Sequence, residues 1–353
     1  MRHEVWGAML LLALAVALMA VACSRPAANP TPTPCADPTT RPDAQFCGPD
    51  EAGGLPDSSS PFPGSEDSVT YAITETLRVV NKGPGAPDKQ NLWVALIAEA
   101  EPHQRVEAMT IAPATYTLVT DEYGNRYAEF DFSGQPAGQT IPISIAYRVV
   151  VDEATADLTS CTGPLPAEFT QPELHIESDN PQITALAAEL AQGKATACDK
   201  VRAFYDYIGS HLVYSYNGRN WGAQAALGEM GADCSEYSDL LIALSRAAGI
   251  PARYLEGLAW FPHDASALAR TEHAWVEVFL PGSGWTPIDP TLGRSSLTRV
   301  AYFAHLPPDH ILITRGRNPS TLRGASYFTH LYWPGKSADI RIEDFGWEIR
   351  PVE

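Results

Sequence analysis

Two long segments of the chain alternate apolar and polar residues with a period of two. Apart from Glu75, every second residue from Val69 to Val79 is apolar, and the same holds from Ile141 to Val151. This period places one face of each segment in a core, as in antiparallel strands. Shorter runs separated by turn residues lie between them, without a helical period. The pattern predicts a β-sandwich over residues 67–158.

After Pro172 the period changes to that of amphipathic helices. The first helix is predicted to begin at Asn180 with Pro181 in its first turn, and to end at Gly193. The second begins at Thr196 and carries apolar residues at helical spacing as far as Leu212. We interpret both apolar stripes as faces buried in a core.

A third predicted helix begins beside a cysteine. Asp233 as N-cap and Glu236 at position N3 form a capping box, which places Cys234 at N1, and Gly249 follows as the C′ residue. A thiol at N1 meets unpaired backbone N–H groups and the positive end of the helix dipole, which favour thiolate over thiol. The backbone N–H of Cys234 is also a candidate oxyanion donor.

A histidine and an aspartate follow Cys234 and could complete a catalytic triad. His273 lies 39 residues later on a predicted strand, and Asp289 lies a further 16 residues on, at a strand end. An imidazolium would stabilise the thiolate and donate a proton to a leaving group, and a carboxylate would fix the imidazole tautomer. If Leu280 and Trp285 flank a simple hairpin turn, however, His273 pairs with residue 292, about 10 Å along the strand from Asp289. A twist, a bulge or a register shift must therefore close the gap.

Four motifs around these residues resemble one family. They are GADCSEY at 231–237, LSRAAGIPAR at 244–253, HAWVEV at 273–278 and DPT at 289–291. Together they are similar to the transglutaminase-like superfamily, over about residues 179–325, and the similarity continues loosely through 309–311 and 316–318. The resemblance implies a papain-like fold in which Cys234 is the nucleophile, His273 the base and acid, and Asp289 the orienting carboxylate.

Two tryptophans are further candidates for the site. Tissue-type family members use an upstream tryptophan near the oxyanion, for which Trp221 is the nearest candidate, although loop or core packing is the alternative. Strand parity turns His273 and Trp275 toward the cleft, so Trp275 is a candidate substrate wall or a half-buried strand residue. Tissue-type members also carry a tryptophan directly after the nucleophile, where this chain has Ser235.

The chain has six cysteines. With Cys23 assigned to a lipid and Cys234 to catalysis, four remain, and in an exported protein these suggest two disulfides. The most local pairing is Cys35–Cys47 and Cys161–Cys198, and unpaired thiols are the alternative. Cys198 is also a rival nucleophile, because it lies near a helix start, but no matching motif accompanies it.

The N-terminus has the pattern of an exported lipoprotein. Residues 1–22 are typical of a signal peptide, and residues 20–23 resemble the lipobox that precedes a lipidated cysteine, here Cys23. Ordinary cleavage after Ala22, giving a secreted protein, is the alternative. Residues 24–66 hold ten of the 30 prolines, so we expect 23–66 to be a semi-extended tether.

Composition narrows the range of functions. A length of 353 residues fits about two domains. We therefore expect a catalytic domain at 159–325 and a terminal strand extension at 326–353. The net charge of −18 argues against nucleic-acid binding. The sequence contains no metal-ligand motif and no phosphate-binding glycine loop, so we expect no cofactor.

These observations predict an α+β protein, exported and anchored to a membrane by a lipid. We expect a cysteine enzyme that acts on peptide or glutamine amide bonds of cell-envelope proteins or peptides through an acyl-thioester. Ser235 favours hydrolysis over transfer to an amine. The alternatives are a protein-glutamine γ-glutamyltransferase and a non-catalytic surface module that binds peptide.

Overall fold

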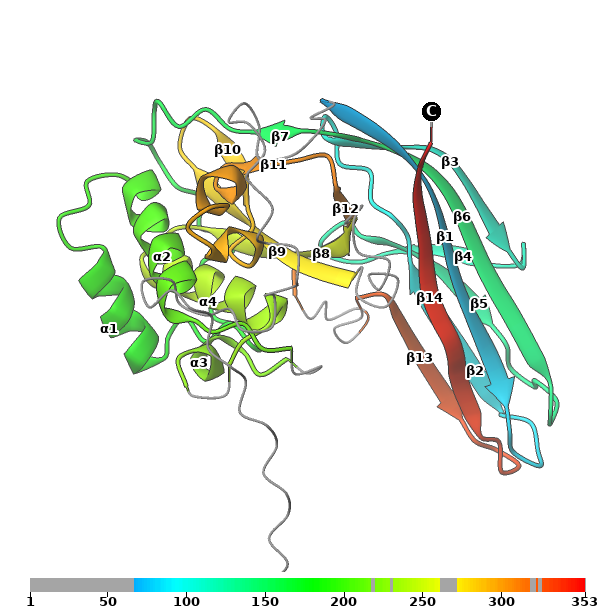
Figure 1. Cartoon of the computed structure of the whole chain (residues 1–353). Coiled ribbons are helices and arrows are strands. Elements are labelled where there is room, and N and C mark those ends of the chain that lie inside the picture. Colours follow the sequence, from blue (N-terminus) through cyan, green and yellow to red (C-terminus); the bar gives the residue numbers. More distant parts are fainter. Residues whose placement is uncertain are drawn as a thin grey trace, which may run out of the picture. The chain divides into compact units, whose positions relative to one another are not determined.

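The computed structural model describes residues 67–216, 220–228, 231–260, 272–317, 322 and 326–352. The expected signal peptide, the candidate lipidation site Cys23 and the candidate disulfide Cys35–Cys47 lie outside these residues. Within them, no helix is long and apolar enough to span a bilayer. The fold is α+β, as predicted (Figure 1).

The predicted sandwich consists of two antiparallel sheets of four strands each. Their orders are β14–β1–β6–β3 and β13–β2–β5–β4. The strands are β1 (Ser68–Asn81), β2 (Lys89–Ala95), β3 (Gln104–Ala112), β4 (Thr117–Thr120), β5 (Arg126–Asp131), β6 (Thr140–Asp152), β13 (Phe328–Trp333) and β14 (Ile340–Val352). Alternate residues of β1, such as Tyr71 and Ile73, share one core with Leu92 and Phe130 of the other sheet. The period of two predicted the buried faces of β1 and β6.

Both C-terminal strands belong to this sandwich. β14 pairs with β1 from Thr70↔Val352 to Asn81↔Ile340, and β13 pairs with β2. The sequence predicted a strand in the 326–353 segment but not its partner, because a period of two gives a strand's buried face and not the neighbour to which it bonds. Figure 1 shows β14 alongside β1.

The middle of the chain forms helices and a third four-stranded antiparallel sheet with the order β10–β9–β8–β12. Its elements are α1 (Pro181–Leu190), α2 (Ala197–His211), α3 (Ala223–Ala226), α4 (Cys234–Ala247), β8 (Ala252–Ala259), β9 (Glu272–Leu280), β10 (Gly284–Ile288), η2 (Leu292–Arg294), η3 (Arg299–Tyr302) and β12 (His310–Arg315), and the short strands β7 (Ala154–Thr155) and β11 (His305–Leu306) pair with each other. Asn180, Thr196 and Asp233 cap α1, α2 and α4, and the three helices begin where the sequence predicted.

Helix α4 is buried on every side, whereas its apolar stripe predicted one buried face. It packs on β8 and β9 and against the other three helices. Two of its buried charged residues form ion pairs: Asp239 lies 3.3 Å from Arg317, and Arg246 lies 2.8 Å from Glu173. These ion pairs let charged residues occupy a helix face that a sequence pattern would assign to solvent.

Helix α2 is also tied covalently to the segment that leaves the sandwich. Cys161 and Cys198 form the predicted disulfide, with their Cα atoms 5.7 Å apart. Cys198 lies in the first turn of α2 and is buried. It is therefore not available as the rival nucleophile, and Cys234 is the free cysteine of the described residues.

Candidate active site

The capping box fixes the start of α4. The Asp233 side chain accepts a hydrogen bond from the N–H of Ser235, and the N–H of Asp233 donates to Glu236 Oε2 at 2.9 Å. Glu236 Oε1 accepts from the N–H of Trp221 at 2.8 Å, so this fully buried side chain ties the loop before α3 to the start of α4. Burial raises the pKa of Glu236 against the lowering effect of these two hydrogen bonds. Cys234 therefore sits at N1 of a helix whose first turn is rigidly held.

His273 and Asp289 meet in spite of the gap predicted between them. His273 Nε2 and Asp289 Oδ2 are 2.7 Å apart. The hairpin of β9 and β10 pairs Val276 with Ile288, one residue out of the predicted register, and the ladder ends there. Continued by one residue, it would set Asp289 opposite Trp275, on the same sheet face as His273. The contact is thus a diagonal one across the strand pair, which long side chains can span.

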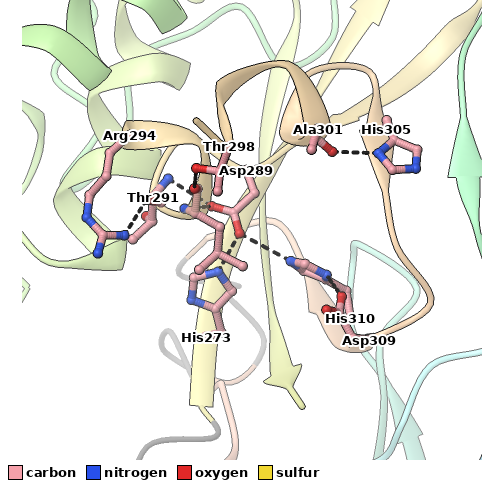
Figure 2. A network of polar contacts seen from close by, with 10 residues as sticks. His273, Asp289, Thr291, Arg294, Thr298, Ala301, His305, Asp309 and His310 are labelled. Atoms are coloured by element: carbon pink, nitrogen blue, oxygen red, sulfur yellow. Dashed lines mark hydrogen bonds and ion pairs between the residues drawn. The ribbon is translucent and has the colours of Figure 1, made fainter. Parts of the chain in front are cut away.

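Asp289 is fully buried and each of its oxygens accepts two hydrogen bonds. Oδ1 accepts the N–H groups of Thr291 and Leu292, at 2.8 and 2.9 Å, as the chain turns into η2. Oδ2 faces Nε2 of His273 and, at 3.2 Å, Nε2 of His310. Burial alone would raise the pKa of Asp289, but the two histidines outweigh it and hold the pKa well below its usual range. Figure 2 shows both imidazoles directed at this carboxylate.

His273 lies between the carboxylate and the thiol. Its Nε2 faces Asp289, and its side chain also hydrogen-bonds with Cys234, which leaves Nδ1 as the ring nitrogen for sulfur. Burial disfavours the imidazolium, but Asp289 and Cys234 outweigh burial and raise the pKa of His273 to about 9. The arrangement supports a histidine that stays protonated beside the thiol at neutral pH.

A cavity of about 250 Å³ opens at Cys234 and His273. The helix start, β8, β9 and the C-terminal segment all contribute to its lining, which consists of Tyr216, Asn220, Asp233, Cys234, Ser235, Tyr254, Glu256, Glu272, His273, Ala274 and Tyr327. Burial raises the pKa of the Glu256 carboxyl to about 7. The cavity gives a substrate access to sulfur and the imidazole together.

The two candidate tryptophans lie in different surroundings. Trp221 is held near the start of α4 through its backbone bond to Glu236, and its side chain is 41% exposed. Trp275 is only 2% exposed and packs with Leu255 and Tyr302 in a separate cluster. It does not line the cavity at Cys234, so the interpretation as a substrate wall does not fit its position. Its face of the sheet is covered by other elements, which strand parity cannot reveal.

Sequence reasoning assigned no role to two pairs of residues near the site. His310, at the start of β12, contacts Asp289, and its Nδ1 lies 2.6 Å from Asp309 Oδ1. Arg317 bridges to Asp239 of α4 and lies over the ring of Tyr254, 4.0 Å from its centroid. The family resemblance extended to the segments that contain both residues, at 309–311 and 316–318, and was the available signal.

Ligand atoms of His273, Asp289 and His310 lie within 4.8 Å of one another, a spacing that could hold a metal ion. They form the one such group in the described part of the chain. However, Asp289 Oδ2 is already the hydrogen-bond partner of both imidazoles. We therefore interpret the group as a hydrogen-bonded network and not as a metal centre.

The fold and this geometry define a class: an α+β domain with a cysteine at a helix start, a histidine on the adjacent sheet and a buried aspartate behind it. The transglutaminase-like superfamily model matches residues 184–290, a range that contains all three. The chain therefore contains a transglutaminase-like superfamily domain, as the motifs predicted.

Known proteins are similar to part or to most of this chain. A protein-glutamine γ-glutamyltransferase of Pseudomonas aeruginosa is 31% identical over 132 residues, and the uncharacterised Bacillus subtilis protein YebA is 28% identical over 130. Each alignment covers 32% of this chain and only 18% of the relative. The crystal structure of a candidate cysteine protease from Cytophaga hutchinsonii superimposes with a TM-score of 0.60 at 18% identity, over 82% of this chain and 92% of that one. This last likeness shows a common fold.

Proposed function

We propose that the protein is an exported cysteine enzyme that cleaves peptide or glutamine amide bonds through an acyl-thioester. Cys234 Sγ attacks the amide carbon, the backbone N–H of Cys234 faces the oxyanion, and the C–N bond breaks as His273 protonates the leaving amine. Water then attacks the thioester, His273 accepts its proton, and the thiol is released with a carboxylic acid. Asp289 keeps the imidazole oriented throughout.

One observation carries this proposal. His273 contacts both the Asp289 carboxylate and the Cys234 thiol, and the cavity is lined by the thiol and the imidazole together. A cysteine buried only for packing would require neither a paired histidine nor an opening to solvent.

Transfer to an amine is the second candidate, and the relationship to a protein named γ-glutamyltransferase favours it. In that reaction a primary amine replaces water as the attacking group. We favour hydrolysis because Ser235 stands where tissue-type transglutaminases have tryptophan, and this position adjoins the cavity. Incubation with a glutamine-bearing protein and a fluorescent amine separates the two: amide cleavage without incorporation of label excludes the transferase.

The substrate class follows from the compartment. The Cys161–Cys198 disulfide is typical of proteins outside the cytoplasm. We propose that lipidated Cys23 and the proline-rich 23–66 tether hold the enzyme at a membrane, facing proteins or peptides of the cell envelope. Release of the protein from membranes by Cys23→Ser would support the anchor, and equal release of the wild type would indicate a secreted protein.

The decisive experiment compares wild type with Cys234→Ala on envelope proteins and peptidoglycan peptides, with product masses as the readout. Ser238→Ala is a matched control, because it lies one turn later on α4, is fully buried and has a hydroxyl without a hydrogen-bond partner among the described residues. We expect mass changes with wild type and Ser238→Ala and none with Cys234→Ala. Equal products from all three proteins would exclude Cys234 as nucleophile.

The reactivity of the Cys234 thiol distinguishes a cysteine enzyme from a non-catalytic module that binds peptide in the same cavity. A catalytic Cys234 should react with iodoacetamide at pH 6 much faster than a free thiol does, since the thiolate is the reacting form. Reaction at the rate of a free thiol would favour the binding module.

A further inference from the structure

His310 is a buried histidine placed between two carboxylates. Its side chain is 2% exposed, with Nε2 3.2 Å from Asp289 Oδ2 and Nδ1 2.6 Å from Asp309 Oδ1. In each contact the carboxylate oxygen can only accept a hydrogen bond, so the ring nitrogen must donate it. Figure 2 shows the ring of His310 between the two carboxylates. Asp309, His310 and Asp289 are consecutive members of one hydrogen-bond network, which continues through His273 to Cys234.

This geometry determines the protonation of His310. A neutral imidazole has one N–H, so either tautomer would turn a nitrogen lone pair toward one of the two carboxylates. Only the doubly protonated ring donates to Asp289 and Asp309 at once. His310 is therefore an imidazolium that donates to both carboxylates.

Aromatic rings and titratable groups of other elements surround His310. The ring of Trp275 on β9 meets it edge-on with centroids 5.1 Å apart, and those of His273 and Tyr302 lie at 5.8 and 6.1 Å. His310 also lines a cavity together with titratable groups of the catalytic sheet and of the sandwich: Glu101, His103, Asp152, Arg253, Glu277 and Arg315. Burial lowers the pKa of His310, but the two aspartates outweigh it and raise the pKa to about 9.

We propose that His310 is a positioning residue for the candidate triad: an imidazolium at neutral pH, held by Asp309, that fixes Asp289 and limits how strongly Asp289 attracts the proton of His273. This inference rests on the proposed function. Because His273 and His310 share the single oxygen Oδ2, neither has the carboxylate to itself. The result is a His273 acidic enough to give its proton to a leaving amine.

The first test observes His310 directly and needs no substrate. Wild-type protein labelled with ¹⁵N in its histidine rings is followed by NMR from pH 5 to pH 9, and His310→Gln identifies the His310 signals. We expect both ring nitrogens of His310 to remain protonated up to pH 8. A neutral His310 tautomer at pH 7 would overturn the proposal.

The second test uses the rate of Cys234 alkylation by iodoacetamide, measured by mass spectrometry against pH. His310→Gln removes a like charge about 6 Å from His273, so the upper inflection, at which His273 loses its proton, should rise by about one to two pH units. A rate change without this rise, or a fall in the inflection, would mean that His310 supports only the local structure.

Asp309→Asn provides an isosteric second variant at a partly exposed position. If Asp309 acts through His310, the double variant should have the same pH profile as His310→Gln alone, whereas additive shifts would refute that role. Neither readout requires turnover, so these results are separable from failure of the proposed amidase activity.

Discussion

Asp289→Asn tests the electrostatics of the site most directly, because it removes a charge and keeps the shape. The new Oδ1 can still accept the N–H groups of Thr291 and Leu292. The new amide, however, turns N–H donors toward the two histidines, which are themselves donors in the wild type. His273 must then accept at Nε2 and carry its proton on Nδ1, which is the wrong tautomer to receive a proton from the thiol.

The magnitude follows from the pKa of His273, about 9 against its ordinary 6.5. That difference corresponds to about 3 kcal/mol in favour of the imidazolium. Without Asp289 the burial of the ring prevails and the pKa of His273 falls to 6.5 or lower. At pH 6 to 7 the thiolate then loses most of its counter-ion, and we expect alkylation of Cys234 to slow by about 100-fold.

The assay is the iodoacetamide rate at Cys234, measured at pH 6 on protein with unchanged circular dichroism. Asp131→Asn, the same substitution at a surface position of the sandwich, is the control and should match wild type. If Asp289→Asn reacts within threefold of wild type at pH 6, Asp289 does not govern the protonation of His273 and the reasoning is refuted.

Three further predictions concern stability. His273 and His310 have folded pKa values of about 9 against 6.5, so their stabilisation is complete below pH 6.5 and lost as pH rises to 9; Tm should fall over that range. Buried Glu256 has a folded pKa of about 7 against 4.5, so the stability that its protonated form contributes should be lost as pH rises from 4.5 to 7. A Tm that rises from pH 5 to 9 would contradict the predicted direction for the two histidines and for Glu256. Cys161→Ser opens a crosslink spanning 37 residues and should lower the free energy of unfolding, measured in urea, by about 3 to 4 kcal/mol. The difference between variant and wild type should disappear when the wild-type disulfide is reduced. Gln104→Ala should cost about 1 to 3 kcal/mol, because it leaves the buried N–H of Leu312 on β12 without its acceptor. Gln90→Ala removes a buried amide that has no side-chain hydrogen bonds in the described structure, and it should cost less.

Local chemistry made the start of α4 predictable. A capping box spans four residues, so Asp233 and Glu236 sufficed to place Cys234 at N1, and the structure has both hydrogen bonds of that box. The family motifs supplied the remaining candidates. The contact of His273 with Asp289 was less predictable, because it depends on where β10 ends. The register of a simple turn pairs His273 with residue 292, whereas the observed pairing of Val276 with Ile288 is shifted by one residue and sets Asp289 diagonal to His273.

The sequence did not predict the roles of residues whose partners lie far away along the chain. Trp275 shares the sheet face of His273, but strand parity cannot reveal that other elements cover it. Likewise, His310 is the first residue of β12, and only the fold shows that Asp289 is within reach. Strand β14 was predicted as a strand, yet its partner β1 lies more than 250 residues earlier. Each case involves pairing across the chain, which periodicity does not encode.

The contacts of the sandwich with β12 argue that this domain does more than space the enzyme from a membrane. β12 is an edge strand whose outer side would be unpaired. Gln104 of the sandwich accepts from the N–H of Leu312 and donates to its carbonyl, at 2.7 and 2.8 Å, and Asn125 does the same for Arg315, at 2.8 Å each. Two side-chain amides thus substitute for a neighbouring strand. Since β12 begins at His310, the sandwich holds in register the strand that reaches Asp289, and a catalytic domain cut free of it would lose that register.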